Sequence, residues 1–459
     1  MTTLQHILSI TNSGLQTSQA VVASASRNIA NANTPGYAHE TLPLSSQLGG
    51  LGVVAGTAIA SRNALLEQGI AATSARLGFY QSQTNQLDSM ELAFNDLDGT
   101  GLGISMRDFE SAVSAVAANP ASITDRGQML ESARSLAATF ASTRESVARA
   151  ANDANEQAVS IAQEINSLAQ QVAQLNSRIR SARPGEERNS LISQRAAVID
   201  SIGGRIGVDV VPRSDGTVSL ISSSGRPIVD STFPATLAVN VSPPPASEAR
   251  VEFVGEGDTR LPAGSVGGEL GGLVEFHNDI AQPALERIDE LAYSFMDAFN
   301  EAHRSGFTLN GATGYDFFDL PSGAQGAASK VALSRDVDGH PENIAAAADL
   351  AAIPGDNTNA LVLQGILSQD GVMADGSSVV NAWETLGSSV SHTLLRTQAG
   401  VDLEQASLDQ LENLLASETG VNIDEELIRV TQANTALSAA NTVLQELQTM
   451  TDTILGMVG

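Results

Sequence analysis

The stretch NIANANTPGYAHE, residues 28–40, marks a sharp change in the character of the chain. Pro35 disfavours a helical conformation at Thr34, and Gly36 supplies a flexible exit. The preceding segment, residues 1–27, carries a single charged residue, Arg27, although the whole chain has a formal net charge of -28. A segment of such low charge suits a helix that packs into a crowded core, where an unpaired charge is costly. The stretch therefore predicts a boundary between a terminal helix and a separately folded body.

The asparagines of this stretch, Asn28, Asn31 and Asn33, allow two interpretations. Their amides hydrogen-bond either between neighbouring subunits or to the local backbone at the helix end, and the second role suits Asn31 and Asn33 at least as well. Tyr37 follows directly and begins the path toward the outer domains.

Apolar and small side chains recur on one stripe at each end of the chain, which predicts that the two terminal helices pair as a coiled coil. The N-terminal stripe includes polar positions such as Thr11 and Ser18, so we expect it to be too weak to fold alone and to order on assembly. The predicted assembly residues are Leu4, Leu8, Leu15, Val22, Asn28, Ile29, Asn31, Asn33, Pro35, Gly36, Tyr37, Ile423, Leu427, Val430, Leu437, Leu444 and Leu447.

Helical periodicity dominates the interior, with a β-rich interruption over residues 205–262. There, Val208 and Val210 are followed by a Ser-Asp-Gly turn and a second alternating run, which is typical of a β-hairpin. The sequence thus predicts a mainly α, elongated, nested multidomain fold with an inserted small β domain. The predicted limits are 1–45 with 418–459 for the terminal coiled coil, 46–202 with 272–417 for the helical body, including some strand content near 326–340, and 203–271 for the β insert.

Composition restricts the function classes. The chain has 52 Asp and Glu against 24 Lys and Arg, and such an acidic surface repels nucleic acid and anionic lipid. It has no cysteine, which excludes disulfides and thiol chemistry. No stretch reaches the ~18 apolar residues of a membrane span, and the N-terminus lacks the pattern of a cleaved signal peptide. We expect a cytoplasmic protein or one exported by a route that does not read such a signal.

No motif in the sequence indicates an enzyme. The six histidines lie outside the paired spacings of metal ligands, and packing or surface roles suit them better. Residues 96–107 approach a calcium loop, but Arg107 stands where a bidentate glutamate is needed. The glycine cluster at 267–272 is not followed by the lysine of a phosphate-binding loop. We therefore predict no catalytic residues, no metal and no cofactor.

Several quoted segments resemble those of a known family. NIANANTPGY, together with residues 420–445, resembles the terminal signatures of bacterial flagellar axial proteins, which comprise rod, hook and hook-associated proteins. The interior segments GLGISMRDFESAVSAVAANPASITDR at 101–126, NEQAVSIAQEINSLAQQVAQLNSRI at 155–179 and FNEAHRSGFTLNGATGYDFF at 299–318 are similar to those of the hook-associated protein 1 family. The resemblance extends over nearly the whole chain.

This resemblance implies a structural protein of the flagellar hook–filament junction, located outside the cell and exported by the flagellar type III pathway with an uncleaved signal. The implied partners are further copies of the chain in a ring, hook protein, hook-associated protein 3, and an export chaperone at the C-terminal region. Two alternatives stay open: another axial protein, such as hook protein or hook-associated protein 3, or an axial protein with a hydrolase activity in the inserted domain.

Overall fold

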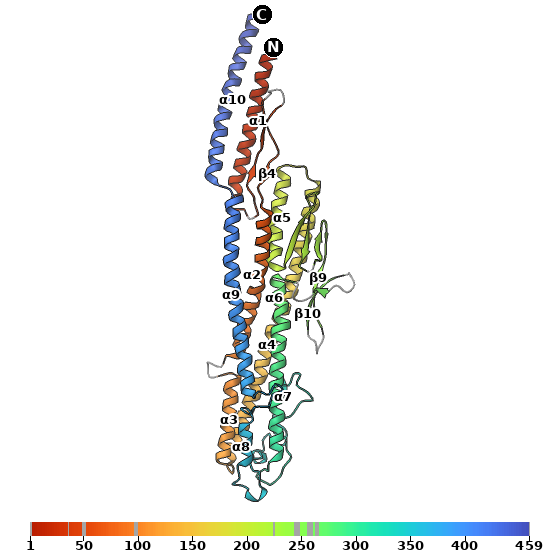
Figure 1. Cartoon of the computed structure of the whole chain (residues 1–459), viewed down its shortest axis with the longest axis vertical. Coiled ribbons are helices and arrows are strands. Elements are labelled where there is room, and N and C mark those ends of the chain that lie inside the picture. The colour runs from red at the N-terminus through yellow and green to blue at the C-terminus, as the bar shows by residue number, and fades with distance from the viewer. Residues whose placement is uncertain are drawn as a thin grey trace.

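The computed structural model describes residues 2–34, 36–47, 52–95, 100–223, 225–242, 248–254, 260–261 and 266–458. The molecule is long and narrow, and both chain ends lie at the same tip (Figure 1). Helix α4, Ile123–Ser181, has 59 residues. At 1.5 Å per residue it alone is about 90 Å long, which explains the elongated shape.

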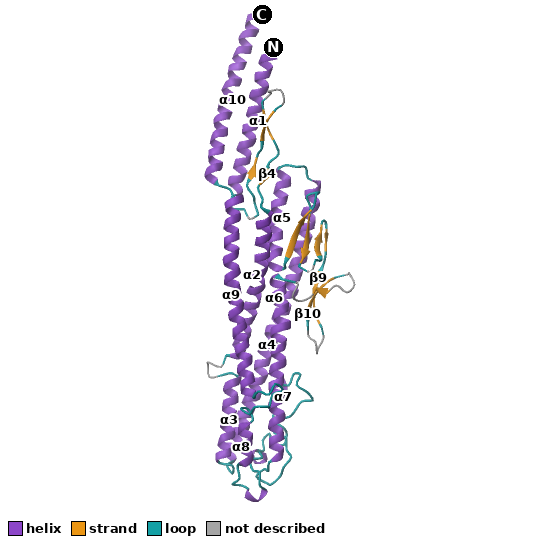
Figure 2. Ribbon diagram, in the orientation of Figure 1, coloured by secondary structure: helices purple, strands orange, loops and turns teal. Residues whose placement is uncertain are grey.

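Helices form most of the described structure (Figure 2). Besides α4, they are α1 (Thr2–Asn31), α2 (Ala64–Glu91), α3 (Leu102–Ala118), α5 (Glu186–Arg205), α6 (Gly268–Glu275), α7 (Gln282–Ser305), α8 (Thr358–Gly365), α9 (Val379–Thr419) and α10 (Ile423–Val458). A π-helical segment, Phe276–Ala281, joins α6 to α7, so these elements form one continuous rod. Short 3-10 helices occur at Leu92–Phe94, Ala328–Lys330, Pro341–Asn343 and Leu350–Ala352.

The strands are short and form separate antiparallel sheets. The inserted β region has a four-stranded sheet, in the order β5 (Val208–Pro212), β6 (Val218–Ser222), β7 (Pro227–Asp230) and β8 (Phe233–Pro234), and a three-stranded sheet, in the order β11 (Arg260–Leu261), β10 (Ala249–Phe253) and β9 (Leu237–Val241). Near the chain start, β1 (Glu40–Thr41) pairs with β4 (Ile59–Ala60), and β2 (Leu44–Ser46) pairs with β3 (Val53–Ala55).

Three asparagines fasten the inserted β region to the helical body. Asn166 on α4 donates to the carbonyl of Leu237 and accepts from the amide of the same residue, both at 2.8 Å. Asn176 on α4 makes the same two-way contact with Val218, and Asn278 in the π-helical segment makes it with Ala249. Leu237, Val218 and Ala249 are each the first residue of their strand. The asparagine amides therefore make the hydrogen bonds that a neighbouring strand would otherwise make there.

The main hydrophobic core extends along the helical body. Its far end holds a cluster of phenylalanine rings from α3, α7 and the following loop, in which the centroids of Phe317 and Phe318 are 4.8 Å apart. Among the described residues, neither core cluster includes a side chain of α1 or α10. The body therefore has its own core, to which the described side chains of the terminal helices do not belong.

The predicted fold class is confirmed: the protein is mainly helical and elongated, with small sheets and with α1 packed beside α10. Near 326–340, where some strand content is predicted, the described chain has the 3-10 helix Ala328–Lys330 and an isolated bridge between Leu333 and Phe318. The predicted domain limits stay a prediction.

Candidate assembly site

The terminal helices α1 and α10 extend beyond the body and lie side by side (Figure 1). Apart from Arg429, the less exposed positions over residues 426–447 of α10 repeat at spacings of four and three: Glu426, Val430, Ala433, Leu437, Ala440, Leu444 and Leu447. Facing positions on α1 include the buried Thr11 and Ala25 and the half-buried Leu4, Leu15, Val22 and Ile29. This pattern is a coiled-coil seam, but small and polar side chains occupy much of it, so it buries little apolar surface.

Three of the predicted apolar assembly residues are exposed in the single molecule, although the spacing of Leu8 from Leu4 and Thr11 places it on the α1 stripe. Leu8 is 43% exposed, Ile423 is 44% exposed and Leu427 is 50% exposed. On α10 the buried position beside Leu427 belongs to Glu426, which is only 1% exposed. A charged residue thus occupies a seam position that the sequence pattern assigns to a leucine.

Asn28 explains why a carboxylate is tolerated there. Its side chain is fully buried, and its amide nitrogen donates to the carbonyl of Glu40 at 2.9 Å and to Oε2 of Glu426 at 3.1 Å. Its carbonyl oxygen accepts from the amide of Glu40 at 3.0 Å and from the phenol of Tyr37 at 2.8 Å. A buried amide with all its hydrogen bonds formed fixes one register of the segments around it.

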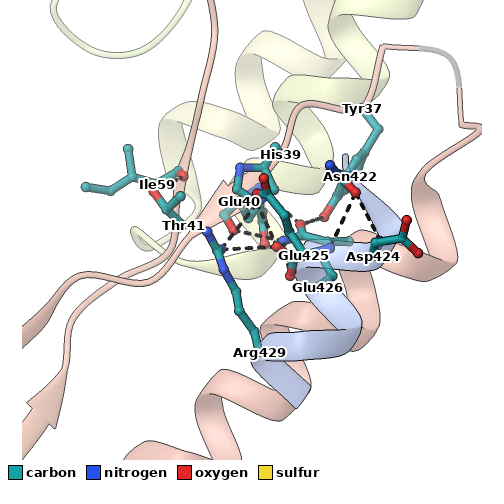
Figure 3. A network of polar contacts seen from close by, with 11 residues as sticks. Tyr37, His39, Glu40, Thr41, Ile59, Asn422, Asp424, Glu425, Glu426 and Arg429 are labelled. Atoms are coloured by element: carbon teal, nitrogen blue, oxygen red, sulfur yellow. Dashed lines mark hydrogen bonds and ion pairs between the residues drawn. The ribbon is translucent and has the colours of Figure 1, made fainter. Parts of the chain in front are cut away.

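The carboxylate of Glu426 connects α10 to the chain after α1 (Figure 3). Its Oε1 lies 3.0 Å from Nε2 of His39 and 3.1 Å from Nη1 of Arg429. Asn422 caps the helix start, with its Oδ1 accepting from the amide of Asp424 at 3.1 Å. Removing one partner of such a buried charge costs more than the pair itself contributes, because the remaining charge is left desolvated.

A second set of contacts ties the same junction to helix α5 of the body. Arg27 lies 2.7 Å from Oε1 of Glu186 and 3.7 Å from Oε2 of Glu40. The other oxygen of Glu40 accepts from Asn189 at 3.0 Å. Burial, reinforced by the charge of Glu40, raises the pKa of the Tyr37 phenol to about 12, so this hydroxyl stays a donor at neutral pH. The junction therefore joins α1, α10 and α5.

The remaining residues of the opening stretch have local roles. Asn31 donates to the carbonyl of Arg27 at 2.9 Å, which is a helix-end contact, and Asn33 is exposed. Gly36 has a φ of +74° and lies against the backbone of α5, where an added Cβ would be 3.0 Å from the carbonyl oxygen of Ser193. Both its conformation and its close approach favour glycine. Pro35 lies outside the described residues.

A cleft of about 690 Å³ opens beside the junction, between the end of α1 and helices α4 and α5. Its wall mixes charges and amides, including Arg27, Glu40, Gln174 and Arg178. Within the described residues, no group of three or more His, Asp or Glu side chains is placed to hold a metal ion. In the same part of the chain, no helix is both long and apolar enough to span a membrane.

His39, Glu40 and Glu426 are junction residues that the sequence pattern does not predict. Their partners are far apart in sequence, so periodicity gives no signal for them. One signal does exist: Arg27 is the single charged residue of its segment, and a lone charge in a packed helix needs an opposite charge nearby.

Comparisons with known proteins agree with this architecture. The family model described as "Flagellar hook-associated protein FlgK helical domain" matches residues 87–318. Flagellar hook-associated protein 1 of Bacillus subtilis is 26% identical over an alignment that covers 97% of this chain and 96% of that protein. The Escherichia coli protein of the same name is also 26% identical, over 67% of this chain and 59% of its own length.

A solved structure has a similar fold. It is described as the flagellar hook junction protein FlgK from Burkholderia pseudomallei, and it superposes with a TM-score of 0.67 at 16% sequence identity. The match covers 76% of this chain and 99% of that structure.

Proposed function

The chain belongs to the flagellar hook-associated protein FlgK family, and from this premise we propose that it is a structural component of the bacterial flagellum that forms the junction between hook and filament. The observation that carries the proposal is the pair α1 and α10, which projects from a self-contained body and has a seam too polar to be stable alone. Such a pair gains stability when identical pairs surround it, as in a tubular assembly.

We propose that the predicted assembly residues, apart from the exposed Asn33, act in or next to this pair. Leu15, Val22, Leu437 and Leu444 would hold the two helices together, while Asn28, Gly36 and Tyr37 would fix the angle at which the pair leaves the body. The exposed Leu8, Ile423 and Leu427 would contact neighbouring molecules, because each lies close in sequence to further exposed apolar side chains, such as Ile7 and Ile428, and grouped apolar surface commonly marks an interface.

The partners follow from the proposed position. The chain would form a ring of its own copies, with hook protein on one side and hook-associated protein 3 on the other. It would reach the flagellum outside the cell through the type III pathway, without a cleaved signal peptide. A chaperone would bind the C-terminal region before export, where α10 exposes Ile428, Val443 and Met450 and would otherwise aggregate. We propose a structural role with no cofactor and no catalytic step.

Deleting the gene and restoring it tests the proposal. A strain without the chain should lose motility and release unassembled flagellin into the medium, and the wild-type gene should reverse both effects. Immunogold labelling should place the chain between hook and filament. Labelling along the whole hook, or beyond the junction on the filament side, would instead support hook protein or hook-associated protein 3.

A further inference from the structure

Residues 40–47 and 52–61, here called the arm, fold back along the outside of α1 as two short antiparallel ribbons, β1–β4 and β2–β3. Two helix hydroxyls hold the arm in place. Thr17 donates to the carbonyl of Val53 at 3.0 Å, and the amide of Val53 donates to Ser13 at 3.2 Å. Gly52, with a φ of +113°, allows this approach, because an added Cβ would collide with Ser13.

The arm exposes apolar side chains on both of its faces. Val53 is 39% exposed and Val54 is 43% exposed, and neighbouring residues of a strand point to opposite faces. Leu44 and Ile59 are more exposed still, at 54% and 59%. A ribbon of two strands is marginal in water without a covered face, so the arm lacks the burial that would stabilise it in a single molecule.

The charge distribution identifies what covers the arm. The chain has a net charge of -28, yet residues 1–26 and 41–61 contain no Asp, Glu, Lys or Arg. Two copies of such an acidic protein repel wherever their bodies face each other, but not where this uncharged surface meets its equivalent. A basic partner would gain no electrostatic attraction from an uncharged surface. A second acidic copy, in contrast, can approach closely only where the surface carries no charge.

We propose that the arm is a subunit contact: the arm of one copy packs against the N-terminal half of α1 in the next copy, where Ile7, Leu8 and Ile10 are each more than 40% exposed. The inference rests on the proposed self-assembly and adds the surface that carries it. The two surfaces differ, so the contact is heterologous. A heterologous contact builds a ring where the rotation between neighbours closes and a helical tube where it does not, and both suit a tubular assembly.

Cysteine cross-linking tests the contact directly, because the chain has no cysteine of its own. Val54→Cys and Leu8→Cys copies are expressed together in the deletion strain, and isolated flagella are oxidised and run on a non-reducing gel. We expect a dimer of the chain that forms only when both variants are present. Matched controls pair Leu8→Cys with Leu361→Cys, which is 53% exposed on α8 at the opposite end, and should give no dimer.

A dimer in the control as strong as in the test, no dimer in the test, or a cross-link from Val54→Cys to a different flagellar protein would each overturn the proposal. These results are distinguishable from failure of the proposed function. If the function is wrong, the deletion strain keeps its filaments; if only the contact is wrong, the chain still assembles at the junction but is not cross-linked.

A charge placed in the arm gives an independent measurement. The double variant Val54→Asp with Ile59→Asp should reduce the amount of chain retained on isolated hooks roughly tenfold or more, because each buried carboxylate would lack a partner. Leu361→Asp should be retained like the wild type. The purified double variant should match the wild-type circular dichroism, since the arm lies outside the main core. Normal retention of a correctly folded double variant would contradict the proposal.

Discussion

At the scale of single residues, one device recurs through the molecule. Asn28, Asn166, Asn176 and Asn278 each bind both the amide and the carbonyl of one residue, and that residue always begins a strand. The backbone of a helix cannot hydrogen-bond to a strand, because its amides and carbonyls are already paired within the helix. An asparagine on the helix surface supplies the missing donor and acceptor at the correct spacing. The same chemistry therefore attaches both the inserted β region and the arm to their helices.

Replacing Asn28 by aspartate should impair assembly. The change removes two hydrogen-bond donors and places a third carboxylate beside Glu40 and Glu426. Loss of satisfied buried hydrogen bonds costs about 1–3 kcal/mol, which would lower the affinity for the hook roughly tenfold or more. The amount of chain retained on isolated hooks measures this effect. Asn33→Asp, at an exposed position of the same stretch, is the matched control, and equal retention of both variants would refute the assigned role.

His303 makes the stability of the body depend on pH. The ring is buried, its Nδ1 donates to the carbonyl of Tyr315 at 2.8 Å, and its Nε2 accepts from the amide of Ala345 at 3.0 Å. The acceptor role of Nε2 requires the neutral ring, and burial lowers the pKa of His303 to about 4. The unfolded chain, with an ordinary histidine pKa near 6.5, therefore binds a proton at pH 5 that the folded chain does not.

The expected result is a loss of roughly 2 kcal/mol of unfolding free energy between pH 7 and pH 5 from this residue alone. Urea denaturation of the wild type and of His303→Gln at the two pH values measures it. The glutamine has a donor and an acceptor but does not titrate, so its stability should fall less over this range. If the two proteins lose the same free energy, His303 does not carry the effect.

At the scale of elements, the seam of α10 has a definite phase. Leu437 and Leu444 lie on the face toward α1, whereas Ser438 lies outside it. Leu437→Asp or Leu444→Asp should abolish assembly at the junction, because an unpaired charge in the seam is desolvated without compensation. The central domains should remain folded, which thermal denaturation checks. Ser438→Asp adds the same charge outside the seam and should assemble; assembly of all three variants would count against a coiled-coil seam.

Periodicity predicts the long helices well and the seam only in part. Ile161, Ile165 and Val172 recur at helical spacing and are buried on α4. A continuous apolar stripe of this kind fixes which face of the helix points into the core. At the start of α10 the stripe is weaker. There Leu427 is more apolar than Glu426, yet Glu426 is the buried residue, because Asn28 and His39 pair with it. A contact to residues almost four hundred positions away has no local signature.

The arm and the π-helical segment show the other limit of sequence analysis. Strands of two or three residues, such as Glu40–Thr41 and Val53–Ala55, are too short to display an alternating pattern. Their conformation depends on the helix beside them. The π-helical segment, whose Asn278 pairs with the strand residue Ala249, likewise has no local sequence pattern that predicts it.

At the scale of the whole molecule, the core and the terminal pair should differ in stability. Because the core clusters lie in the body, we expect the isolated monomer to keep its body folded while α1 and α10 are largely unfolded. Hydrogen exchange of the monomer should show slow exchange over residues 129–179 of α4 and fast exchange over residues 5–30 and 425–455. Strong protection of both terminal ranges before assembly would disprove this expectation.

The position of the two chain ends has a practical consequence. Both ends lie at the tip formed by α1 and α10, and the loops between α7 and α8 lie at the opposite end of the molecule (Figure 1). In the proposed assembly, an epitope or a fluorescent protein fused to either terminus would clash with the terminal helices of neighbouring subunits. The exposed turn at Gly339 faces open space, and an insertion after it keeps the glycine that its φ of +78° favours and leaves those helices unchanged. Imaging of living cells should use that turn and avoid the ends of the chain.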